Sequence, residues 1–65
     1  MSRQKIIDFA RNGIDVEELK KYRKYLYSIG DFDSADELGE SLKNYLNDPN
    51  DLTEAELLTT LKYLV

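Results

Sequence analysis

The sequence predicts an all-α protein, a compact array of four short helices joined by short turns. A helix-start pattern occurs three times, at residues 15–19, 34–38 and 53–57, and successive occurrences are 19 residues apart. Each begins with a residue that can cap a helix, followed three places later by Glu and then by Leu, which is typical of a helix N-terminus. Apolar residues then recur at helical spacing, and no segment alternates apolar and polar residues as a strand does.

The first two helices are expected over about residues 3–11 and about residues 16–28. Gly13 should end the first helix, because glycine tolerates the left-handed conformation found at helix ends. Asp15 should cap the second helix by accepting a backbone N–H bond, and Gly30 should end it. The expected apolar face of the second helix is Leu19, Tyr22, Leu26 and Ile29.

The third helix is expected over about residues 35–46. Ser34 and Glu37 have the spacing of a capping box, in which each side chain bonds the other residue's backbone N–H. Gly39 lies in the middle of this helix, where glycine costs about 1 kcal/mol relative to alanine, so we expect it to allow a close approach. The expected apolar stripe is Ala35, Leu38, Leu42, Tyr45 and Leu46.

The fourth helix is expected over about residues 54–64, after a turn at residues 47–51 that contains Asn, Asp and Pro. Thr53 and Glu56 have the spacing of a third capping box. Its apolar face is expected to contain Leu57, Leu58, Leu61, Leu64 and Val65.

Residues 1–65 are predicted to form a single helical domain. A chain this short buries little surface, and without Cys or His it has neither disulfides nor the usual zinc ligands to stabilise it. Dimerisation could therefore complete the core. The equal spacing of the helix starts does not require a repeat, because caps and first core leucines recur in any set of similar helices.

We expect no enzymatic activity, cofactor or metal site. Without His or Cys, acid–base or nucleophilic chemistry would depend on carboxylates, Lys, Tyr or Ser, and the carboxylates are at helix starts or on exposed faces. No calcium-binding loop pattern is complete. The sequence has neither a signal-peptide pattern nor an apolar run long enough to span a membrane, so we expect a cytoplasmic protein that does not bind membranes. The composition resembles that of small bacterial or phage proteins.

Our leading functional hypothesis is a small protein that acts by binding another protein, itself included, in a regulatory or interaction role. Tyr63 lies away from the apolar face of its helix, and Tyr25 and Tyr27 flank the apolar face of the second helix. Tyrosine is enriched at interfaces because it buries a large area while keeping a polar end. We therefore name these three as candidate partner contacts, with a homodimer as one form of association.

Charge suggests two alternatives. Seven basic and four acidic side chains give residues 1–24 a charge of +3, and two basic and nine acidic side chains give residues 25–65 a charge of −7. The basic face of the second helix could bind nucleic-acid phosphates. The acidic half could instead imitate nucleic acid and act as an inhibitor. The candidate phosphate contacts are Lys20, Lys21, Arg23 and Lys24.

Overall fold

A computed structural model describes all residues, 1–65, and contains four α-helices and no strand. They are α1 (Arg3–Asn12), α2 (Val16–Ser28), α3 (Phe32–Asn47) and α4 (Asp51–Leu64). The all-α prediction is therefore confirmed, and Gly13 and Gly30 both have the positive φ expected where a helix ends.

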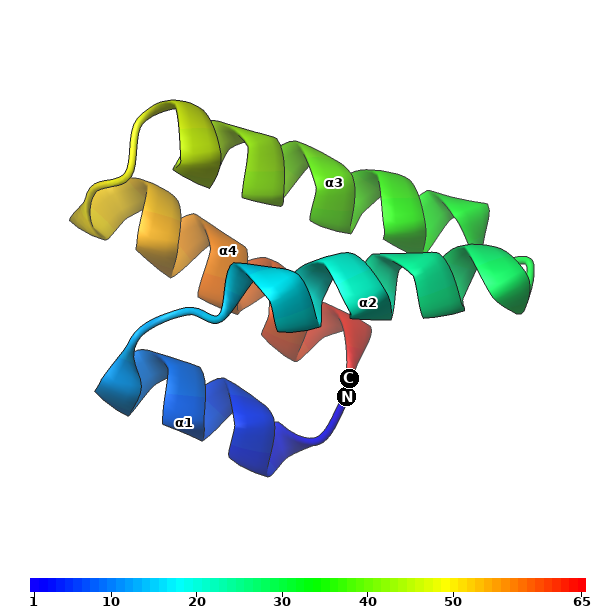
Figure 1. Cartoon of the computed structure of the whole chain (residues 1–65), viewed down its shortest axis with the longest axis horizontal. Coiled ribbons are helices and arrows are strands. Elements are labelled where there is room, and N and C mark those ends of the chain that lie inside the picture. Colours follow the sequence, from blue (N-terminus) through cyan, green and yellow to red (C-terminus); the bar gives the residue numbers. More distant parts are fainter.

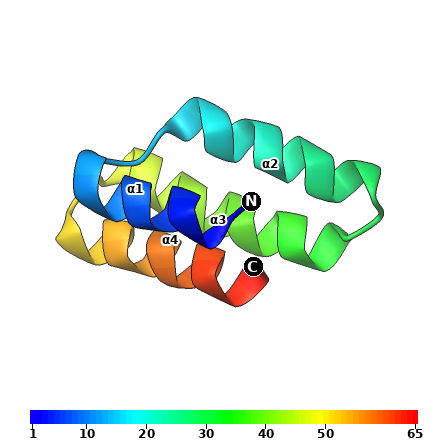
Figure 2. The same cartoon turned by 90° about the horizontal axis from the view of Figure 1, so that it is seen from below.

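The helices form a bundle in which packing follows the order α2, α3, α4, α1 (Figure 1). α3 packs against both α2 and α4, while α1 packs against α4 rather than against α2, its neighbour in sequence. The two chain ends lie close together in both views (Figures 1 and 2). The outer face of each helix is thus free to carry function.

All four helices contribute to one small apolar core. Leucines provide most of it, because the i, i+3, i+4 spacing of each helix turns them to the same side. No polar or charged residue is buried. The buried residues are Ile6, Phe9, Leu19, Leu26, Ala35, Leu38, Leu42, Leu57 and Leu61. Three residues expected on apolar faces, Ile29, Leu46 and Val65, are instead about half exposed, since they lie at the ends of α2, α3 and α4 beyond the reach of the core.

The predicted cap of α2 is correct, whereas that of α3 is wrong. The Asp15 carboxylate accepts hydrogen bonds from the backbone N–H groups of Glu17 and Glu18. α3 begins one turn before Ser34: Asp31 caps it, and the N–H of Ser34 donates to the Asp31 carboxylate at 3.3 Å. Phe32 and Asp33 extend the helix at its start, where an acidic residue also suits the helix dipole.

The predicted cap of α4 is also wrong. Asn50 caps this helix, and its side-chain oxygen accepts the N–H of Thr53 at 2.9 Å. The Thr53 hydroxyl in turn accepts the N–H of Asn50 at 3.0 Å, so Thr53 is the second member of a capping box and Glu56 has no part in it. Successive caps after Asp15 are therefore 16 and 19 residues apart, and the equal spacing seen in the sequence is not a spacing of helix starts.

Candidate functional site

The outer face of α4 carries two of the most exposed large side chains of the molecule. The exposed fraction is 69% for Leu52 and 80% for Tyr63. Ala55 and Thr59 are exposed between them, at the helical spacing that places all four residues on one side. We call Leu52, Ala55, Thr59 and Tyr63 the α4 outer stripe.

The four residues of the α4 outer stripe are uncharged, with Glu56 and Lys62 exposed on either side of them, whereas charged residues dominate the exposed faces of the neighbouring helices. α2 exposes Lys20, Lys21 and Lys24, and α3 exposes Glu37 and Glu40. A helix of a small water-exposed bundle normally turns charged residues outward, so an uncharged outer stripe indicates a surface that another helix could cover. Tyr63 forms no side-chain hydrogen bond and no aromatic contact within the chain, and its ring is therefore available to a partner.

The other two candidate tyrosines do not share a surface with Tyr63. Tyr27 lies at the α2–α3 contact, where its hydroxyl accepts a bond from Arg23 at 3.1 Å and donates one to Asp36 at 3.0 Å. Tyr25 stacks on Tyr22, with ring centroids 6.3 Å apart. The structure thus gives Tyr27 an intramolecular role and leaves Tyr25 exposed on a different helix from Tyr63.

Two further exposed apolar residues, Ile29 and Phe32, flank the turn between α2 and α3. The Phe32 ring lies 5.9 Å from that of Tyr27, which anchors one side of it. Helical periodicity had predicted a buried position for Ile29 and no role for Phe32. The Gly-Asp turn between them could have predicted their exposure, because apolar residues directly beside such a turn lie at the end of a bundle.

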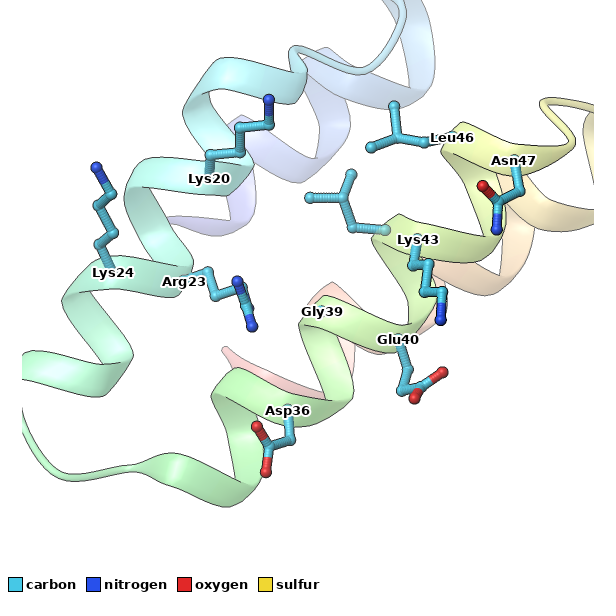
Figure 3. A pocket seen from close by; sticks show the side chains of 10 residues that line it. Lys20, Arg23, Lys24, Asp36, Gly39, Glu40, Lys43, Leu46 and Asn47 are labelled. Carbon is cyan, nitrogen blue, oxygen red and sulfur yellow. The ribbon is translucent and has the colours of Figure 1, made fainter.

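A groove between α2 and α3 collects most of the basic residues considered for phosphate binding (Figure 3). Lys20, Arg23 and Lys24 line it from α2, and Lys43 joins them from α3. Lys21 lies elsewhere, beside Met1 and Lys5 near the start of α1. The α2–α3 groove encloses about 760 Å³ and is lined by Lys20, Arg23, Lys24, Asp36, Gly39, Glu40, Leu42, Lys43, Leu46 and Asn47.

Arg23 crosses the α2–α3 groove because Gly39 has no side chain. Figure 3 shows the Arg23 side chain reaching from α2 toward Gly39 of α3, and a Cβ at position 39 would lie only 2.9 Å from Arg23 Nε. The guanidinium also lies over the Tyr27 ring, 5.1 Å from its centroid, in a cation–π contact. The expected close approach at Gly39 is thus that of an arginine side chain, and contacts with Gly39 and Tyr27 position this cation.

The pKa of Tyr22 is raised, and this predicts an effect of alkaline pH on stability. Burial of the half-buried ring raises the pKa of the Tyr22 phenol above its ordinary value of 10.0, and neighbouring Tyr25 and Asp31 raise it further. The folded state disfavours the ionised phenol, so the neutral Tyr22 side chain contributes to the stability of the fold. This contribution is complete below pH 10.0 and is lost as the pH rises through the raised pKa. Tyr22→Phe should therefore reduce the loss of stability measured by urea unfolding between about pH 8 and about pH 11.

Tyr63→Phe is the matched control for this titration, since it removes an exposed phenol. It should keep the pH dependence of the unmodified protein. Equal pH dependence in the Tyr22→Phe and Tyr63→Phe proteins would show that Tyr22 does not couple ionisation to folding.

No group of three or more Asp or Glu side chains is arranged to hold a metal ion. None of the helices has both the length and the apolar character required to cross a bilayer. Comparison with protein-family models, with curated proteins and with solved structures finds no match. Two surfaces of the chain itself, the α4 outer stripe and the α2–α3 groove, are the features that indicate a function.

Proposed function

We propose that this protein acts by binding another protein, a second copy of itself included, and that it does so through the α4 outer stripe. One observation carries the proposal: α4 exposes two large side chains, Leu52 and Tyr63, on its outer face while its opposite face fills the core. Burying these side chains against a partner would remove apolar area from water at about 25 cal/mol per Å².

The residues between the two large side chains favour a helix as the covering element. Ala55 and Thr59 are small, so a partner helix could lie close to α4, at the 8–10 Å axis separation typical of packed helices. Two copies could pair in this way around a two-fold axis, since each would supply the same surface. A homodimer is thus one form of the proposed association, and a regulatory partner protein is the other.

Nucleic-acid binding is a second candidate, favoured by the meeting of Lys20, Arg23, Lys24 and Lys43 around one groove. The same groove contains Asp36 and Glu40, which would repel phosphates. This candidate predicts an affinity that falls steeply with salt. Undetectable binding of an oligonucleotide at about 50 mM salt would exclude it.

Tyr63→Glu tests the leading proposal, because it places a charge at the most exposed aromatic side chain of the expected contact. We expect the association constant to fall by at least about tenfold, as for an aromatic residue that anchors an interface, with unchanged helical content by circular dichroism. Self-association is measured by sedimentation equilibrium. Association with other proteins is measured by capture from nuclease-treated extracts of the native cell.

Asn44→Glu is the charge-matched control, since it adds the same charge on the exposed face of α3. Its association should equal that of the unmodified protein. If Tyr63→Glu and Asn44→Glu associate equally well, the α4 outer stripe is not the binding surface.

A further inference from the structure

The α2–α3 groove has a charge opposite to that of the molecule. Four cations line it against two carboxylates, Asp36 and Glu40, so its net charge is +2 in a chain whose net charge is −4. A local positive surface within a negative one steers an acidic partner to that place and repels it elsewhere. The groove therefore selects for acidic ligands.

The cations of the groove are not neutralised by the chain's own acids. Only Lys20 has an ion pair, 3.7 Å from Glu17, and this pair is exposed and therefore weak. Arg23 donates to the Tyr27 hydroxyl and keeps its other N–H groups free of protein acceptors. A guanidinium that is held in position and has free N–H donors can form a bidentate hydrogen bond with a carboxylate.

The remaining lining of the groove includes two leucines. Leu42 is buried at its base, and Leu46 is 49% exposed beside it. Both belong to α3, one turn apart, and Lys43 lies between them in sequence. Apolar side chains with cations around them match a helix that has leucines on one side and acids beside them.

We propose that the α2–α3 groove binds an acidic amphipathic helix of a partner protein. Apolar side chains of that helix cover the exposed part of Leu46, and its carboxylates meet Arg23, Lys20 and Lys43. This surface is distinct from the α4 outer stripe, so the protein has two separate binding surfaces and can hold two partners at once.

Other occupants fit less well. A nucleic-acid strand would bring phosphates against Asp36 and Glu40 and would leave Leu46 in contact with charge. A second copy of this chain that used the same groove would place two surfaces of net charge +2 together. A protein helix can avoid both costs, because it can place an acid at one turn and a lysine or an apolar residue at the next.

The test uses the whole 65-residue chain and a fluorescein-labelled synthetic peptide of about 18 residues, which as a helix would span the 16 residues of α3. The peptide has Leu at every third or fourth position and Glu and Ala elsewhere. Fluorescence anisotropy should show saturable binding that weakens as salt increases. A peptide with Lys in place of Glu should not bind.

Two substitutions of the same kind separate the groove from overall charge. Lys43→Glu reverses a groove charge, and Lys62→Glu makes the identical change on the exposed part of α4. We expect Lys43→Glu to raise the Kd by about tenfold and Lys62→Glu to change it by less than about twofold. Arg23→Gln, which removes the positioned guanidinium, should also raise the Kd by about tenfold.

Three results would overturn the proposal. The first is absence of saturable peptide binding, or equal Kd values for the Lys43→Glu and Lys62→Glu proteins. The second is tighter binding of a thymidine oligonucleotide of the same charge, which would make nucleic acid the ligand. The third is a change in the protein's own sedimentation, without a change in peptide binding, on Arg23→Gln. Each of these leaves the Tyr63 experiment unaffected, because that experiment concerns α4.

Discussion

Leu38→Ala should lower the free energy of unfolding by about 3 kcal/mol, since it removes a fully buried leucine and leaves a cavity. Leu38 has an exposed fraction of 0% and lies on α3, the helix that packs against two others. A chain of 65 residues has a total stability of about 3–10 kcal/mol, so a loss of this size would remove about a third of it or more. Urea unfolding followed by circular dichroism measures the change.

Leu52→Ala is the matched control for Leu38→Ala, because the chemical change is identical and the site is exposed. It should cost less than about 0.5 kcal/mol when measured at low protein concentration, where the α4 outer stripe is uncovered. A similar loss at both positions would mean that the core lies elsewhere. If Leu52→Ala becomes costly only as protein concentration increases, its side chain is buried by self-association, as the proposed function expects.

Asn50→Ala should lower the free energy of unfolding by about 1 kcal/mol, because it leaves the N–H of Thr53 without its acceptor at the start of α4. It also removes one half of a reciprocal pair, since the Thr53 hydroxyl bonds the backbone of the same residue. Urea unfolding measures the loss, and the transition should keep its slope if the folded state is otherwise intact.

Glu56→Ala distinguishes the observed cap from the one expected from the sequence. If Glu56 completed a capping box with Thr53, its loss would be as costly as that of Asn50. In the structure Glu56 lies in the interior of α4, beyond the cap, so alanine should be neutral or slightly stabilising there. A loss of about 1 kcal/mol on Glu56→Ala would instead indicate that Thr53 caps the helix, as the sequence pattern predicted.

The helix starts show why local patterns specify an element better than its boundary. Asp31 and Ser34 can both cap a helix, as can Asn50 and Thr53, and the members of each pair are three residues apart. Either choice allows the same apolar face, since one extra turn adds residues before the core begins. The structure uses the earlier residue in both pairs, because that choice satisfies one more turn of backbone hydrogen bonds.

The two candidate surfaces differ in how far they could be predicted from the sequence. Tyr63 could be singled out because its position opposite an apolar face follows from helical periodicity alone. The groove could not be predicted, since Lys43 joins Lys20 and Arg23 only when α3 lies beside α2. Lys21 follows Lys20 directly, and yet the rotation of about 100° per residue in an α-helix turns it toward α1 instead.

The sequence by itself determined that this chain is helical, where its helices lie to within a turn, and which side of each helix turns inward, because these properties follow from local spacing and turn chemistry. Only the tertiary structure decided which helices are neighbours, and hence that Arg23 crosses Gly39, that Leu46 stays partly exposed and that α4 has an uncharged outer stripe next to no other helix. The physical reason is that a groove or an uncovered face is defined by two or more helices at once, whereas a helix is defined by its own residues.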